Sequence, residues 1–143
     1  MKALSVKQPF AGLIARGIKT LEIRSQKTNY RGELLICSAS KPVHELTNYY
    51  HYLGDISSIL YSPESMNDRF YQNGLSICKV NLIDCIPFDG TSEQNLAACL
   101  EKEAINNYFP KPNYYAWVLE GAKPIEPFRV KGQLGIFNIE FNR

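Results

Sequence analysis

An uninterrupted apolar stretch constrains the fold of this chain more than any other feature. Residues 32–39, with the sequence GELLICSA, place four apolar side chains in succession from Leu34 to Cys37. A short apolar run of this kind is typical of a strand buried on both faces. The chain has 143 residues, the length of one ordinary domain, and such a domain buries roughly two-thirds of its unfolded surface. It therefore needs no disulfide or metal to fold.

Other segments carry the alternating or strongly apolar patterns that predict further strands. In the longest of them the apolar phase switches between Ile77 and Val80, which indicates a bulge or a barrel corner. The predicted strands, besides the apolar run, span residues 2–7, 20–24, 75–86, 114–120 and 133–141.

Helical spacing is confined to a few short segments. Apolar residues recur every three or four positions over residues 9–16, and Gly17 provides a left-handed stop. A second pattern covers residues 46–53, and Thr91 with Gln94 forms a capping-box pair ahead of a third helix. With at least five strands and two or three helices, the chain is predicted to be an α+β protein built around a small barrel.

Basic residues are concentrated near the N-terminus, although the formal net charge of the whole chain is only +2. Residues 1–41 contain eight Lys and Arg residues against two acidic residues, a net charge of +6. The other residues contain eight basic and twelve acidic side chains, a net charge of −4. This asymmetry predicts one face with a positive potential, suited to phosphate groups. A solvated basic face without a ligand is the alternative.

Hydropathy and cysteine usage predict a cytoplasmic chain without a membrane partner. The N-terminus has no continuous apolar core of a secretory signal, and no stretch approaches the ~20 apolar residues of a membrane span. His44 and His51 lack the spacing that places two ligands on one helical face, so the sequence predicts no metal site and no cofactor. Four cysteines, none in a CxxC pair, are expected to be reduced core residues: Cys37, Cys78, Cys85 and Cys99.

The segment GIKTLEIR places three ionisable side chains next to a predicted helix end. Glu22 and Arg24 share one face of the predicted strand, whereas Leu21 and Ile23 are expected to anchor its back to the core. Lys19 precedes the strand, and its side chain is expected to extend from the turn into the same cleft. Such groups can bind a phosphate and recognise a base, or support proton transfer. The alternative is a half-exposed strand with an ordinary Glu–Arg pair of little energetic value.

Several segments of the chain resemble the ASCH domain family. They are ALSVKQPFA, GIKTLEIRS, YRGELLI with the following ASK, YAWVL, and FRVKGQLGIFNIE near the C-terminus. The matches span both ends of the chain in the family's order and leave mainly residues 42–74 without a counterpart. Phe10 departs from the pattern, since the family more often has tryptophan there.

The resemblance implies a PUA-like fold, a small β-barrel with flanking helices and a cleft for single-stranded RNA or a nucleotide-like ligand. Residues 1–143 would form a single ASCH domain with a variable insertion at about 42–74. The family's motif residues fall on Lys19, Glu22 and Arg24, which would line that cleft. Secondary candidates for ligand binding, by position near the matched segments, are Lys7, Gln8, Ser38, Lys41 and Lys131. The sequence does not specify an oligomeric state.

Two alternatives to a binding module remain open. Some ASCH-like proteins remove an acyl group from a modified cytidine, and others have been described as ribonucleases. The deacylating members have a threonine nucleophile where this chain has Glu22, and Thr20 lies two positions too early to substitute for it. Lys19 and Glu22 would still serve as acid and base in a small hydrolase. A protein-interaction domain without affinity for nucleic acid is the other alternative.

Overall fold

A computed structural model describes residues 1–8, 10–40, 72–87 and 115–140. Six strands and one short helix form an α+β fold, in agreement with the predicted class. The elements are β1 (Lys2–Val6), α1 (Phe10–Ala15), β2 (Leu21–Arg24), β3 (Gly32–Ser38), β4 (Ser76–Pro87), β5 (Tyr115–Pro124) and β6 (Ile136–Asn138). The helices predicted over residues 46–53 and after Thr91, and the insertion at about 42–74, lie largely outside the described residues.

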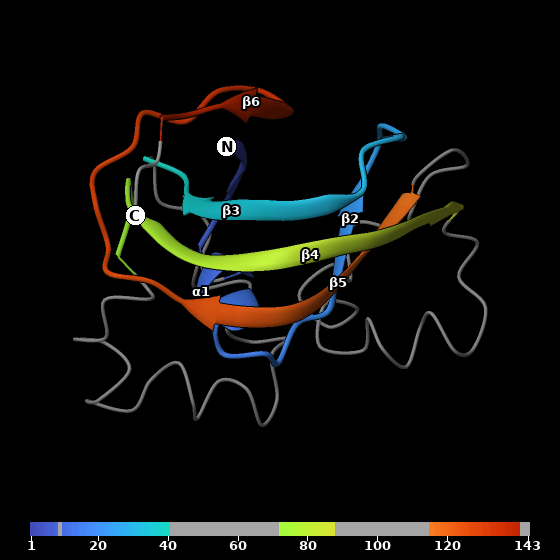
Figure 1. Ribbon diagram of the computed structural model, residues 1–143, viewed down its shortest axis with the longest axis horizontal. Coiled ribbons are helices and arrows are strands. Elements are labelled where there is room, and N and C mark those ends of the chain that lie inside the picture. Colours follow the sequence, from blue (N-terminus) through green and yellow to red (C-terminus); the bar gives the residue numbers. More distant parts are fainter. Residues whose placement is uncertain (9, 41–71, 88–114, 141–143) are drawn as a thin grey trace, which may run out of the picture.

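All six strands belong to one sheet, in the order β2-β5-β4-β3-β1-β6. Strands β1 and β3 are parallel, and the other neighbours are antiparallel. Figure 1 shows the long strands β3, β4 and β5 curving together, so that the sheet forms a half-barrel. The predicted small barrel is confirmed at this level.

Bulges in β4 account for part of this curvature. The ladder with β3 passes from Ile36 opposite Cys78 to Cys37 opposite Ser76, which leaves Ile77 as the extra residue. The ladder with β5 contains two further register shifts. Bulges bend a strand and increase its twist, so a twelve-residue strand can follow the curve of the barrel. The predicted irregularity between Ile77 and Val80 is confirmed.

The main core lies between the sheet and α1. It contains Ala11, Ile14 and Ala15 of the helix together with apolar side chains of β1, β3, β4 and β5. On β3, Leu34 and Ile36 belong to this core, whereas Leu35 and Cys37 pack in a second cluster on the opposite face. The prediction that residues 32–39 form a strand buried on both faces is therefore confirmed. The second cluster also contains Ala3, Val130 and Phe137.

The ends of several elements follow from individual residues. Gly17 has a φ of 73° and ends α1 as predicted, because this left-handed conformation is available to glycine without strain. Strand β6 is shorter than the predicted 133–141. Gly135, with a φ of 66°, immediately precedes it, and its register with β1 covers only Ile136 to Asn138. Strand β5 extends four residues beyond the predicted end at residue 120.

Candidate functional site

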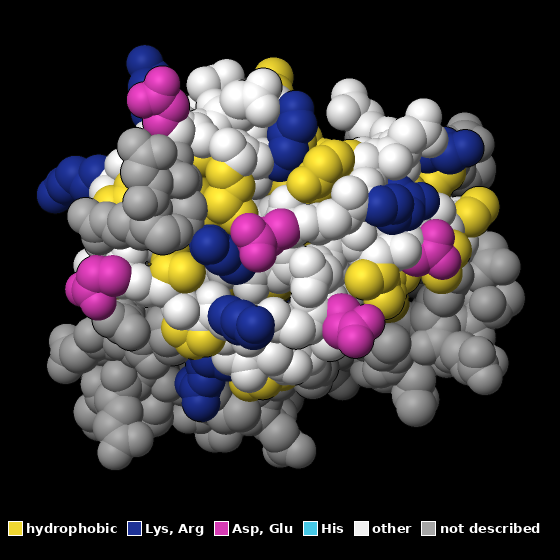
Figure 2. All heavy atoms as spheres, viewed as in Figure 1, with side chains coloured by type: hydrophobic (Ala, Val, Ile, Leu, Met, Phe, Trp, Pro, Cys, Tyr) yellow, Lys and Arg dark blue, Asp and Glu magenta, His cyan; other side chains and the backbone are white. Residues whose placement is uncertain are grey.

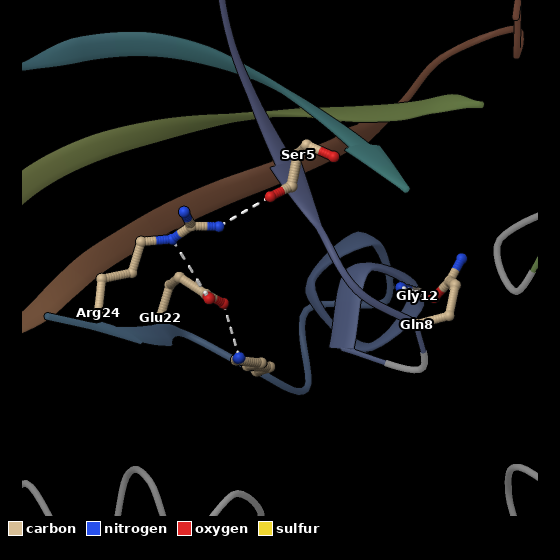
Figure 3. Close-up of polar contacts among 6 residues, drawn as sticks. Ser5, Gln8, Gly12, Glu22 and Arg24 are labelled. Atoms are coloured by element: carbon tan, nitrogen blue, oxygen red, sulfur yellow. Dashed lines mark hydrogen bonds and ion pairs between the residues drawn. The ribbon is translucent and has the colours of Figure 1, made fainter. Parts of the chain in front are cut away.

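The side chains of Lys19, Glu22 and Arg24 converge on the concave side of the half-barrel. Lys19 Nζ donates a hydrogen bond of 2.7 Å to Glu22 Oε2, and Arg24 Nε lies 3.6 Å from Glu22 Oε1. Lys19 is only 6% exposed and Glu22 only 8% exposed. In Figure 3 Glu22 and Arg24 rise from β2 toward one another. We refer to these three residues as the ion cluster, and their burial distinguishes it from an ordinary surface pair.

Register with β5 explains why the ion cluster points inward. Glu22 lies opposite Trp117, which belongs to the main core, so this face of β2 looks toward the helix. Leu21 and Ile23 point the other way and form a small separate cluster with Ala116. These two residues therefore anchor the back of β2 to the core, as expected, but they do so through this smaller cluster and not through the main core. Alternation predicts that two residues share a buried face, but it does not say which side of the sheet holds the larger core.

Arg24 also joins the two sides of the half-barrel. Its Nη2 donates a hydrogen bond of 2.7 Å to the carbonyl oxygen of Ser5 on β1. Three strands separate β2 from β1 in the sheet, so this bond exists only because the sheet curls until the two strands approach. On the β6 side, the ladder of β1 ends at Leu4 opposite Ile136. Ser5 is the first residue beyond that ladder, and the guanidinium supplies a donor to its carbonyl.

Aromatic rings lie against both cations of the cluster. Lys19 Nζ is 4.6 Å from the ring centroid of Phe10, and Arg24 Cζ is 5.6 Å from that of Trp117. Both separations are within the range of cation–π attraction. The indole N–H of Trp117 donates to the carbonyl oxygen of Gln26. The two rings therefore orient the cations and hold β2 against the core.

One donor of the cluster has no acceptor. Arg24 Nε is buried and makes no hydrogen bond, because 3.6 Å from Glu22 Oε1 is too long for one. Among the described residues it is the single buried side-chain nitrogen or oxygen atom without a partner. Buried polar groups are normally satisfied, so this unused donor beside a carboxylate oxygen requires an explanation.

The sequence model of the ASCH domain matches residues 4–129. This chain belongs to the ASCH domain family. Activating signal cointegrator 1 of Homo sapiens is 41% identical over 96 residues, and its Mus musculus counterpart is 38% identical over the same length. Each match covers 64% of this chain but only 15% of the relative, so the chain corresponds to a small part of those proteins.

Solved structures of the same family share the fold of this ASCH domain. The crystal structure of ASCH from Zymomonas mobilis has a TM-score of 0.60 and covers 97% of this chain and 87% of that chain. A variant of the Zymomonas mobilis protein with one substitution has a TM-score of 0.55, covering 97% of this chain and 89% of that one. Both are only 12% identical in sequence, so the likeness concerns the fold alone.

The secondary candidates occupy two kinds of position in this ASCH domain. Gln8 and Ser38 are buried and bonded to backbone groups. Gln8 Oε1 accepts from the N–H of Gly12 and its Nε2 donates to a carbonyl oxygen, while Ser38 Oγ bonds to the backbone of Leu75. Lys7 and Lys131 are exposed and have no acidic partner among the described residues. Lys41 lies outside the described residues.

The contribution of Ser5 was missed at the sequence level. Its functional atom is a backbone carbonyl oxygen, which every residue has, and its exposure to Arg24 depends on the early end of the β1–β6 ladder. The strand predicted over residues 133–141 is longer than β6, so the prediction did not show that the β1–β6 ladder ends before Ser5. The only available signal was the position of Ser5 within the ALSVKQPFA segment.

Exposed charges on β3 and β4 are mixed in sign. Lys79 lies 3.7 Å from Glu33, and Arg31 lies 3.7 Å from Asp84. Figure 2 shows the corresponding face, where Lys and Arg side chains alternate with Asp and Glu side chains. The N-terminal excess of basic residues therefore does not make this face uniformly positive.

The described cysteines are free and buried, as expected: Cys37, Cys78 and Cys85. Burial raises the pKa of the Cys37 and Cys78 thiols to about 12. Cys99 lies outside the described residues. In the part of the chain that the structure describes, no three His, Cys, Asp or Glu residues are grouped so as to hold a metal ion. None of the helices described there is long and apolar enough to cross a membrane.

Proposed function

We propose that this ASCH domain binds single-stranded RNA or a nucleotide, with one base entering the ion cluster. The observation that carries the proposal is the buried Arg24 Nε without an acceptor, 3.6 Å from Glu22 Oε1. A ligand that accepts from Arg24 Nε and donates to Glu22 would satisfy this donor and complement the carboxylate beside it. A site with such an unused donor binds a ligand carrying the complementary atoms and rejects one that lacks them.

The chemistry of this pair fits the edge of a base better than a phosphate. Nucleobases present hydrogen-bond donors and acceptors next to one another, which complements a carboxylate oxygen beside an N–H group. A phosphate at the same place would meet the negative charge of Glu22. We therefore assign the phosphates to exposed cations such as Lys7 and Lys131, which position a strand without reading its sequence.

Charge balance supports the same assignment. Lys19 and Arg24 together exceed Glu22 by one positive charge, so the cluster attracts an electron-rich ligand while the 2.7 Å bond from Lys19 fixes the carboxylate in place. Arg24 is the accessible member, since its side chain is 25% exposed against 5% for that of Lys19. We expect the ligand to enter from the Arg24 side.

Fluorescence anisotropy with labelled single-stranded RNA at several salt concentrations tests the proposal. Affinity should fall as salt rises, because the phosphates release counterions on binding. Arg24→Gln should weaken binding, whereas Arg31→Gln is a matched control that removes an exposed arginine from an ion pair of 3.7 Å with Asp84. Binding that is absent, or that is lost equally in both variants, would contradict the proposal.

A hydrolase is the second candidate, and the short bond between Lys19 and Glu22 favours it. A buried ammonium 2.7 Å from a carboxylate is a pair between which a proton can move during acid–base catalysis. Thr20 is exposed, unlike these two residues, which gives no support to a threonine nucleophile. Incubation with single-stranded RNA and with an acylated cytidine tests this candidate. Turnover that Glu22→Gln abolishes would support catalysis, and no turnover would leave binding as the function.

A further inference from the structure

The segment of residues 129–135, which we call the 129–135 loop, is fixed at both ends. Arg129 forms an isolated bridge with Leu75, and Val130 is buried and donates its N–H to the carbonyl oxygen of Gly74 at 3.0 Å. At the other end Gly135 adopts a φ of 66° and leads directly into β6. The tip of the loop therefore lies between two fixed ends.

The middle of the loop packs against Ser5, the residue whose carbonyl oxygen accepts a hydrogen bond from Arg24. A Cβ atom on Gly132 would lie 2.6 Å from Ser5 Oγ and 3.2 Å from Ser5 Cβ, so any other residue here would have to displace Ser5 or the loop. The carbonyl oxygen of the same Ser5 accepts the hydrogen bond from Arg24 Nη2. The loop and the ion cluster are thus in contact with one residue of β1, from two sides.

The exposed side chains of the loop suit a ligand that is both anionic and partly apolar. Leu134 is 99% exposed, far more than Ile83, the other exposed large hydrophobic residue of the described chain at 48%. A single exposed leucine is common on protein surfaces. Here, however, it stands two residues from the contact with Ser5, and the exposed Lys131 precedes that contact by one residue.

We propose that the 129–135 loop binds the nucleotide next to the one held by the ion cluster. Lys131, together with Lys7, meets the phosphate that joins the two nucleotides, and Leu134 packs against the neighbouring base. Apolar side chains such as leucine insert between the base steps of duplex DNA, so leucine can pack on the face of a base, and the adjacent cation would hold the backbone. This inference rests on the proposed function and extends it, since the domain would recognise at least two consecutive nucleotides.

A comparison of a mononucleotide with a short single-stranded RNA tests the loop separately from the ion cluster. Affinities of both probes are measured for the unmodified chain, Leu134→Ser and Lys131→Gln. Each variant should lower the ratio of oligonucleotide to mononucleotide affinity, for Leu134→Ser by about fivefold if the base buries roughly half of the leucine side chain. Ile83→Ser is the matched control, because it removes the other exposed apolar side chain from β4, and its ratio should equal that of the unmodified chain.

A steric pair tests whether the loop is positioned through Ser5. Gly132→Ala should weaken oligonucleotide binding, because the new methyl group displaces the loop or Ser5. Ser5→Ala in the same chain removes the oxygen 2.6 Å away but keeps the carbonyl group for Arg24, and should restore much of the affinity. Because relief of the clash would also restore folding, circular dichroism must first show that Gly132→Ala is folded.

The outcomes separate the two proposals. A mononucleotide that binds in an Arg24-dependent manner, with an unchanged affinity ratio in Leu134→Ser and Lys131→Gln, would overturn the loop assignment and leave the proposed function intact. Failure of both probes to bind the unmodified chain would overturn both proposals.

Discussion

Replacing Glu22 by glutamine should destabilise the fold by about 3 kcal/mol, because it leaves a buried lysine without its carboxylate. Two unit charges 2.7 Å apart attract by about 6 kcal/mol at an effective dielectric constant near 20. Desolvation of both groups offsets part of that attraction, so the pair itself contributes less. Removal of one partner typically costs about 3–5 kcal/mol, and the cation–π contact of Lys19 with Phe10 places the estimate at the lower end.

Urea denaturation of the unmodified chain, of Glu22→Gln and of two further variants measures this effect. Glu33→Gln is the matched control, since Glu33 is 3.7 Å from Lys79 with a side chain 58% exposed, and its loss should cost about 1 kcal/mol or less. Lys19→Met combined with Glu22→Gln should recover much of the loss, because no buried ammonium then remains without the Glu22 carboxylate. A Glu22→Gln cost no larger than that of Glu33→Gln would refute the reasoning that the ion cluster is a buried, mutually dependent unit.

Further outcomes follow from individual contacts and from the burial of two cysteines. Arg24→Lys should keep the charge but lose the hydrogen bond to Ser5, which should lower the free energy of unfolding by about 1.5–3 kcal/mol in urea denaturation. An unchanged denaturation midpoint would argue against a role of the Arg24–Ser5 bond in closing the barrel. Gln8→Ala should cost about 1–3 kcal/mol in the same assay, because it leaves the N–H of Gly12 in α1 and the carbonyl oxygen of Gln72 without the Gln8 amide. A neutral result would contradict the role of this buried amide. Cys37 and Cys78, with pKa values raised to about 12, should resist a thiol reagent at pH 8 in the folded state and react on unfolding; rapid labelling of the native chain would contradict this. Because folding favours the protonated thiols, the stability that they contribute is present below about pH 9, the pKa in the unfolded chain, and is lost as the pH rises toward 12.

The fold was predictable where local pattern and tertiary environment agree. The run from Leu34 to Cys37 has apolar side chains on both faces, and both faces are buried because β3 lies inside the sheet with a cluster on each side. Gly17 ends α1 by a backbone conformation that the sequence signals directly. The phase switch after Ile77 predicted a bulge because an extra residue reverses the alternation, whatever the neighbouring strand is.

The candidate site was predictable only in part, for a physical reason. The alternation of side chains along β2 places Glu22 and Arg24 on one face. It cannot reveal that this face points toward the main core while Leu21 and Ile23 face a smaller cluster. Burial of charged side chains contradicts the usual rule that apolar residues point inward. It is tolerated here because Lys19 and Glu22 neutralise one another and aromatic rings lie against the two cations.

Closure of the barrel and assembly of the ion cluster are the same structural event. In the sheet three strands lie between β1 and β2, yet along the chain only α1 lies between them. The curl of β3, β4 and β5 brings them back together, and the bond from Arg24 to Ser5 spans the remaining gap. A ligand that satisfies Arg24 Nε would therefore hold the guanidinium in the orientation that also bonds β1, so binding should stabilise the closed barrel. Thermal unfolding with and without bound nucleotide measures this coupling, and a shift in Tm that persists in Arg24→Gln would show that the ligand acts elsewhere.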